Sequence, residues 1–233
     1  MKKDDVDIDA MTDEEVEFYI QEMTDRQARK PREHEKKGGA SIEYSLVLLV
    51  CSIFALFASA QLLLEERKLL LDPRSSLACD INPIIGCSTF LSDSYSAVLW
   101  NIPNALWGVM FFSGLIALSL ALLSGARFHH FLWRLINVGM VGALTYVVWF
   151  QYISFFVKHG MCPYCLLVWF STLPIIIHTW IRSYQAQRII VPHHDAAVRI
   201  LVKYRWLIVA LVYAVLLICI LVIFWDKWLL LYG

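Results

Sequence analysis

The sequence predicts an all-α integral membrane protein, because of its composition and because of five long apolar stretches. Hydrophobic residues make up 59% of the 233 residues and charged residues only 17%, which is too apolar for a soluble domain of this length. A helix needs roughly 18 or more apolar residues to cross the hydrocarbon core of a bilayer. Five segments meet or approach that length: Tyr44–Leu64, Asn104–Leu123, Phe131–Val157, Cys162–Ile181 and Trp206–Trp225.

A charged segment, residues 1–42, precedes the first apolar stretch. It contains twelve Asp and Glu residues and eight Lys and Arg residues but no apolar core of a cleavable signal peptide, so we expect the first membrane helix to direct insertion. Thr12 and Glu15 have the spacing of a helix capping box, which would start a short amphipathic helix. The charge density favours the alternative, a mostly disordered and solvated tail. The net charge of +0 argues against a nucleic-acid-binding protein.

The distribution of Lys and Arg predicts the orientation in the membrane. Fifteen of the 20 lie before the first stretch, in the turn between the second and third stretches, or in the 182–205 region. Positive residues in short flanking segments are retained in the cytoplasm. The remaining five are Arg67, Lys68, Arg74, Lys158 and Lys227. We therefore expect a multi-pass protein of the cell inner or plasma membrane, with its N-terminus inside and its C-terminus outside.

Two connecting segments differ in length and in charge. The outer loop over residues 65–103 is too long to be a plain connector, so we expect it to carry function. The inner loop over residues 184–205 is basic and contains His193 and His194. Paired histidines can bind metal, but without further ligands a solvated cytoplasmic turn is the default interpretation.

The predicted topology divides the six cysteines into two classes. Cys51 and Cys219 lie deep in apolar helices, where a free cysteine packs as a small hydrophobic residue. The other four lie on the outer side: Cys79 and Cys87 in the long loop, and Cys162 and Cys165 at the outer end of the fourth helix. Disulfides persist outside the plasma membrane and in the secretory lumen, so these four are the candidates for redox chemistry.

Cys162 and Cys165 form a Cys-Pro-Tyr-Cys motif where a helix begins. Proline is tolerated at the first helical position, and helix N-terminal amides lower the pKa of a nearby thiol and increase its thiolate fraction. A zinc half-site and a structural disulfide are the alternatives. A second such motif is absent, and His159 is the one outer histidine close by, so redox use is the favoured interpretation.

Cys79 and Cys87 are separated by seven residues that include Pro83 and Gly86, and they could close a small disulfide loop. Alone, such a bridge would be an ordinary crosslink. Two cysteine pairs on one face can instead relay electrons by thiolate attack on a disulfide. In a membrane, a quinone is the natural acceptor, because it takes the two electrons that two thiols give up.

Three segments resemble the vitamin K epoxide reductase family, in its bacterial form. They are Cys79–Ser88, Asn101–Gly108 and Cys162–Cys165, and the resemblance extends over about residues 44–182. It implies a four-helix transmembrane bundle around a quinone site, with an extracytoplasmic cap loop and an additional fifth helix. The implied organisation is a tail over 1–42, a catalytic domain over 43–183, a basic loop over 184–205, and a fifth helix with a short outer terminus over 206–233.

The resemblance also implies a role for each site residue. Cys165 would face the quinone, Cys162 would exchange with Cys87, and Cys79 would react with the external partner. Asn104 matches an asparagine that hydrogen-bonds a quinone carbonyl, and a plain N-cap is its alternative role. At the position where some family members have a tyrosine donor, this chain has Trp169, whose indole N–H is donor only.

The expected function is that of a quinone-dependent thiol oxidoreductase with menaquinone or ubiquinone as electron acceptor and no metal. Many bacterial relatives continue into a thioredoxin-like domain, whereas this chain stops at Gly233, so the expected partner is a separate DsbA-like thioredoxin-fold protein. Electrons would pass from Cys79 and Cys87 to Cys162 and Cys165, and then to the quinone. The alternatives are reduction of vitamin K epoxide or external disulfides, and a non-enzymatic tetraspan scaffold with static disulfides.

Overall fold

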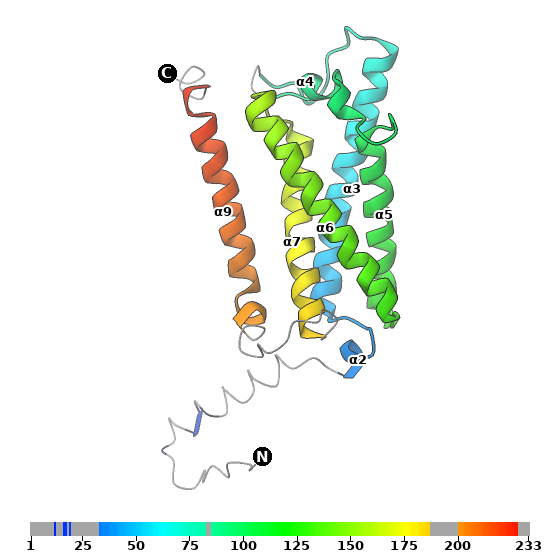
Figure 1. Cartoon of the computed structure of the whole chain (residues 1–233), viewed down its shortest axis with the longest axis vertical. Coiled ribbons are helices and arrows are strands. Elements are labelled where there is room, and N and C mark those ends of the chain that lie inside the picture. Colours follow the sequence, from blue (N-terminus) through cyan, green and yellow to red (C-terminus); the bar gives the residue numbers. More distant parts are fainter. Residues whose placement is uncertain are drawn as a thin grey trace.

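The computed structural model is built almost entirely from helices that run roughly parallel to one long axis (Figure 1). It describes residues 33–82, 85–186 and 200–227, together with the isolated positions 12, 16, 17 and 19. Glu15, Pro83, His193 and His194 lie outside the described residues. The described part contains no strand, only the isolated bridges Ile85–Met161 and Leu99–Ile102.

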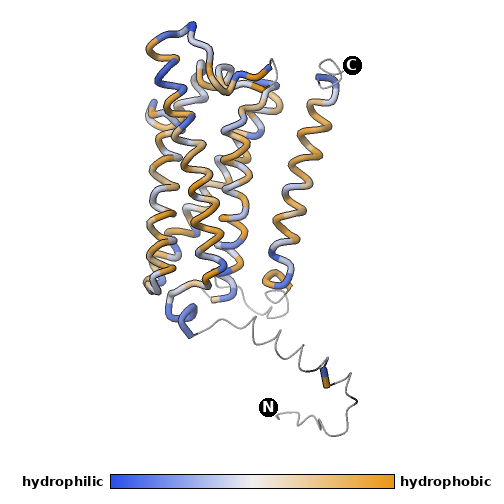
Figure 2. The backbone as a smooth tube through the Cα atoms, turned by 180° about the vertical axis from the view of Figure 1, so that it is seen from behind, coloured by the Kyte–Doolittle hydropathy of each residue, from blue (hydrophilic) through white to orange (hydrophobic). Residues whose placement is uncertain are grey.

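Five helices are long and apolar enough to cross a membrane, which confirms the predicted all-α membrane fold. They are α3 (Ile42–Leu71), α5 (Asn104–Leu123), α6 (His130–Tyr152), α7 (Pro163–Gln185) and α9 (Arg205–Ile223). The short elements are α2 (Glu33–Lys36), α4 (Ser88–Leu91) and the 3₁₀ turn η2 (Ser94–Ser96). A π-helical turn, η3 (Ile153–Val157), extends α6. Hydrophobic residues predominate along these helices, and hydrophilic residues gather toward their ends (Figure 2).

Helix α3 is longer than the apolar pattern predicts. It begins after Ser41, whose hydroxyl accepts a hydrogen bond from the Tyr44 N–H at 3.2 Å. It then continues seven residues beyond Leu64, through Glu65 and Glu66 to Leu71, so residues 65–71 are helical and do not belong to the outer loop as predicted. Glu, Arg, Lys and Leu are good helix formers, and hydropathy alone does not register that preference.

The packing of α3 depends on small side chains. The buried face of α3 includes Ser45, Ser52, Ala55 and Ser59, which let neighbouring helices approach closely. Helices α5 and α7 pack against α3, and α6 packs against α7. The approach of α5 is so close that a Cβ added at Gly108 would lie 2.5 Å from the Ser59 hydroxyl. The result is a four-helix bundle.

Helix α9 lies alongside α7, outside this bundle (Figure 1). Hydrogen bonds attach it at several points along its length. Near its start, Arg205 donates a hydrogen bond to Glu43 of α3 at 2.9 Å. In the middle, the Tyr213 hydroxyl donates to the Phe170 carbonyl of α7, and beyond its end Lys227 donates to the His159 carbonyl. The fifth helix is therefore held at both ends of the bundle.

The two ends of the bundle have different structures (Figure 1). At one end lies α2, where the Gly38 carbonyl accepts hydrogen bonds from the Trp133 indole and the Phe128 backbone, both at 3.0 Å. At the other end lies a cap formed by residues 72–103, which includes α4 and η2. The cap and the start of α7 are at the same end, and all four candidate redox cysteines lie there.

Candidate functional site

A short turn in the cap holds Cys79 and Cys87 together as a disulfide, with 5.7 Å between their Cα atoms. Asp80 organises this turn, because its Oδ1 accepts hydrogen bonds from the backbone N–H groups of Cys87 at 2.7 Å and Ser88 at 3.1 Å. A Cβ at Gly86 would lie 2.7 Å from the same oxygen, so the turn needs glycine there.

The cap is joined to the segment before α7 by backbone and ionic contacts. The Gly86 N–H donates to the Met161 carbonyl at 2.9 Å, within the Ile85–Met161 bridge. Lys158 forms an ion pair with Asp93 of the cap. These contacts bring the Cys87 sulfur to 3.3 Å from the Cys162 sulfur. At that distance the two cysteines can exchange directly by thiolate attack on a disulfide.

Cys162 immediately precedes α7, and its sulfur accepts a hydrogen bond from the Cys165 backbone N–H at 3.4 Å. The pKa of the Cys162 thiol is lowered, first by a hydrogen bond with the Cys165 thiol and then by the backbone amides of Cys165 and Tyr164, while burial opposes the shift. The direction agrees with the effect expected for a helix N-terminus. Of the two cysteines of the motif, Cys162 is thus favoured as the thiolate.

Cys79 is less accessible than a residue that meets an external partner should be. Its side chain is 3% exposed, and that of Cys87 is fully buried. The flanking residues Ala78 and Asp80 are exposed. The cap turn must therefore open locally before a protein can reach either sulfur of this disulfide, a requirement that the sequence did not predict.

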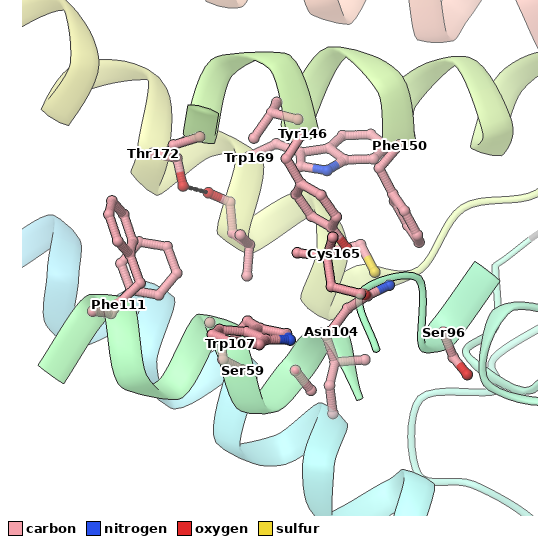
Figure 3. Close-up of a pocket in the computed structure, with 18 of the residues that line it drawn as sticks. Ser59, Ser96, Asn104, Trp107, Phe111, Tyr146, Phe150, Cys165, Trp169 and Thr172 are labelled. Atoms are coloured by element: carbon pink, nitrogen blue, oxygen red, sulfur yellow. Dashed lines mark hydrogen bonds between the residues drawn. The ribbon is translucent and has the colours of Figure 1, made fainter. Parts of the chain in front are cut away.

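A cavity of about 390 Å³ lies in the capped half of the bundle, between α3, α5, α6, α7 and the cap (Figure 3). Its volume is in the range of small-molecule sites, about 300–1,000 Å³. Most of the wall is apolar, with Phe111, Phe112, Phe150 and Val147 among its residues. Cys165 lines this cavity and Cys162 does not. The two cysteines of the motif consequently face different neighbours: Cys162 faces Cys87, and Cys165 faces the cavity.

Asn104, the first residue of α5, lies in the cavity wall but is not an N-cap, because Pro103 occupies that position. Its Nδ2 donates to the Tyr95 carbonyl at 2.6 Å, and its Oδ1 accepts from the Val98 N–H at 3.2 Å. Both contacts orient the amide against the cap. An amide nitrogen has two N–H groups, and among the described residues only the Tyr95 carbonyl accepts from this one, so the second N–H can serve a ligand.

Trp169 also lines the cavity, and its side chain is 2% exposed. Its ring meets Phe155 edge to face, with 5.9 Å between centroids, and Phe150 with 6.5 Å. Phe155 belongs to the π-helical turn η3, so this irregular turn supports the wall beside Cys165. The residue is a rigid part of the wall, and its role as a donor to a ligand stays a prediction.

Several polar residues that were not singled out from the sequence also line the cavity, among them Glu66, Trp107 and Tyr146. The indole nitrogen of Trp107 is buried and has no hydrogen-bond partner among the described residues. The ring of Tyr146 points toward Cys165 from α6 (Figure 3). The position of Trp107, one helical turn after Asn104, was a signal for its placement. Nothing in the sequence distinguishes Tyr146 or Glu66 from other residues in apolar helices.

The described residues contain no candidate metal site, and the two remaining cysteines lie away from the cavity. In the residues that the structure describes, no three His, Cys, Asp or Glu side chains are grouped so that they could hold a metal ion. Cys51 and Cys219 are free thiols within α3 and α9, and neither lines the cavity. They lie in the apolar helices to which the sequence assigned them.

The sequence model of the vitamin K epoxide reductase family matches residues 46–180, which include both cysteine pairs and all the cavity-lining residues named above. No curated protein matches the chain. The matched region comprises most of α3, the cap, α5, α6 and most of α7, and it ends before α9.

Proposed function

Because this chain belongs to the vitamin K epoxide reductase family, a family of membrane oxidoreductases, we propose that it generates disulfides and passes the electrons to a quinone. One observation carries the proposal: Cys165 lines the cavity, while the sulfur of Cys162 lies 3.3 Å from that of Cys87. The four cysteines thus form a continuous path from the cap to the cavity. A static scaffold would not need free thiols at such a distance from a disulfide.

The proposed reaction begins at the cap. A reduced thioredoxin-fold protein of the DsbA type, outside the membrane, reduces the Cys79–Cys87 disulfide by exchange. The Cys87 thiolate then attacks the Cys162–Cys165 disulfide at Cys162, so that Cys165 is released as a thiol facing the cavity. Cys79 attacks Cys87 of the resulting mixed disulfide, which re-forms the cap disulfide and releases Cys162. Reoxidation of this pair delivers two electrons to the acceptor. Each cycle leaves one new disulfide in the partner.

The residues around the cavity fit a quinone headgroup. Its wall is apolar and aromatic, and polar donors approach from α5 and α6: the second amide N–H of Asn104, the indole N–H of Trp107 and the hydroxyl of Tyr146. Hydrogen bonds from such donors stabilise negative charge that develops on a carbonyl oxygen. We assign the principal donor role to Asn104, with Trp107 as an additional donor, and a wall position to Trp169.

The orientation is also proposed, from the charge distribution. The end of the bundle that carries α2 and the turn with Arg127 is assigned to the cytoplasm. The cap, with the cysteines, then faces the extracytoplasmic side of the cell inner or plasma membrane, where disulfides persist.

The direct test is single-turnover reduction of a quinone by the purified protein. The protein is reconstituted with menaquinone or ubiquinone, its outer cysteines are reduced by a thioredoxin-fold dithiol protein, and quinone absorbance is followed. We expect one quinol and one partner disulfide per cycle. If the protein oxidises no thiols with either quinone, or instead reduces the partner's disulfide at the expense of added quinol, the proposed direction is wrong.

Substitution of Gly142 by leucine is expected to block the acceptor site. A Cβ added at Gly142 meets no atom within 4 Å, and this residue lines the cavity, so the larger side chain would occupy the cavity without disturbing the bundle. We expect quinone reduction to fall by about tenfold or more, the loss typical of a filled hydrophobic pocket. Exchange between the two cysteine pairs, measured by thiol trapping, should be unchanged.

Gly114→Leu is the matched control for this substitution. Gly114 lies in α5, a Cβ there also meets no atom within 4 Å, and the residue does not line the cavity. Quinone reduction by that variant should equal that of the unaltered protein. Equal losses in the two variants would mean that leucine acts through general destabilisation and not through the cavity.

A further inference from the structure

Glu66 is a buried carboxylic acid in the wall of the cavity that the proposed electron path does not use. Its side chain is 8% exposed, and it lies on α3, close to the capped end of the bundle. Among the described residues that line the cavity, it is the one carboxylic acid. A buried carboxyl group in an apolar wall costs free energy, so its presence there calls for a partner or a task.

The cap supplies a polar partner for this carboxyl group. The hydroxyl of Ser96, in η2, hydrogen-bonds Glu66, and Ser96 also lines the cavity. Arg67 and Lys68, the next residues of α3, are exposed. Glu66 and Ser96 therefore connect the cavity with the outer end of the bundle, where water is available.

The neighbouring Glu65 has a different environment. It is also buried, at 3% exposure, but it forms an ion pair with Lys68 at 2.7 Å and does not line the cavity. Two consecutive acidic residues of α3 thus have different surroundings: Glu65 pairs with Lys68, whereas Glu66 lines the cavity. This difference makes Glu65 a matched control for Glu66.

The chemistry of the proposed acceptor needs protons as well as electrons. Reduction of a quinone to a quinol consumes two electrons and two protons, and the apolar cavity wall offers few groups that can supply a proton. The other titratable side chains that line the cavity are Cys165 from α7 and Tyr146 from α6, while α5 contributes none. One proton is available from the thiol of Cys165. A second donor is needed when Cys162 reacts as a thiolate.

We propose that Glu66 is the acid that delivers the second proton to the quinone oxygen, a role that rests on the proposed function. In this step the Cys162 thiolate and the Cys165 thiol form a disulfide, the Cys165 S–H bond breaks, and two electrons pass to the quinone. Its two oxygens gain one proton from Cys165 and one from the Glu66 carboxyl group. Glu66 is left as a carboxylate, and Ser96 relays a proton to it from outer water.

The test compares Glu66→Gln with Glu65→Gln in the full-length reconstituted protein. Glutamine keeps the size and polarity of the side chain but holds no transferable proton. A general acid contributes about 10²–10⁴-fold to a rate, so we expect Glu66→Gln to slow single-turnover quinol formation by about 10²-fold. Quinone affinity, measured by quenching of tryptophan fluorescence, should not change, and Glu66→Asp should restore part of the rate.

A second readout does not depend on turnover. Infrared difference spectra of the quinone-free protein across a pH titration should contain a protonated carboxyl band that Glu66→Gln removes and Glu65→Gln retains. In the unaltered protein, the rate of quinol formation should fall as this band disappears with rising pH, and in Glu66→Gln that dependence should be absent.

The outcomes separate this proposal from the proposed function. Quinol formation by Glu66→Gln at the unaltered rate, or a loss matched by weaker quinone binding, overturns the role of Glu66 while the electron path stands. Absence of the Glu66-dependent band at neutral pH also overturns it. If the unaltered protein reduces no quinone, the proposed function fails before any variant is compared.

Discussion

Cys165→Ser is expected to abolish quinone reduction, with a loss of at least about 10³-fold in rate, because no disulfide can then form with Cys162. Cys165 is the one cysteine of the cap pair and the motif pair that lines the cavity. In this variant, Cys162 lacks the thiol that would resolve a mixed disulfide formed at its sulfur. Since the Cys87 and Cys162 sulfurs are 3.3 Å apart, we expect a mixed disulfide between these two residues to accumulate.

Two measurements check this prediction. Quinone absorbance reports electron delivery, and mass spectrometry after non-reducing digestion detects a Cys87–Cys162 crosslink. Cys51→Ser and Cys219→Ser are suitable controls, because both residues are free thiols of spanning helices outside the cavity. Undiminished quinone reduction by Cys165→Ser would refute the assignment of this cysteine to the acceptor.

Cys79→Ser is expected to stop oxidation of the protein partner while the motif pair stays intact. Without Cys79, Cys87 cannot form the cap disulfide, which is the proposed entry point for electrons. We expect partner oxidation to fall to background, a loss of about 10³-fold or more. When Cys162 and Cys165 start as free thiols, as they are in the structure, single-turnover quinone reduction should continue without the cap disulfide.

Oxidation of the partner protein is followed by counting the free thiols of that protein over time. Quinone reduction that does not depend on the cap is followed by quinone absorbance. Cys51→Ser again serves as the control and should support both reactions. Partner oxidation at the normal rate by Cys79→Ser would mean that electrons enter by a route that bypasses the cap, for example directly at Cys162.

The membrane-spanning architecture could be predicted because apolar length is a strong signal. The second span, Asn104–Leu123, agrees with α5 at both ends. The end of α3 could not be predicted from hydropathy, since the charged residues 65–68 look like a loop but continue the helix to Leu71. The π-helical turn at Ile153–Val157 depends on tertiary packing around Phe155 and has no local sequence signature.

The grouping of the four cysteines could be predicted from the sequence, but the residues of the cavity wall and the burial of the cap disulfide could not. The grouping of four cysteines at one end follows from topology, because the loop and the start of the fourth helix must lie on the same side. The cavity wall combines residues from four helices, so the place of Tyr146 or Glu66 in it depends on helix rotation and packing. The burial of Cys79 depends on how the cap folds over the bundle, which spacing does not encode.

The burial of the cap disulfide restricts which thiols can reduce it. Any low-molecular-weight thiol could reduce an exposed disulfide. Under the proposed function its electrons would pass to the quinone, and quinol would accumulate without oxidation of a protein. With Cys79 at 3% exposure and Cys87 fully buried, such thiols collide with backbone and side chains instead of sulfur. Only a reactant large enough to bind the cap and prise open the Asp80 turn gains access. Under the proposed function, the cap would therefore act as a size filter that couples reduction of the quinone to oxidation of a protein thiol.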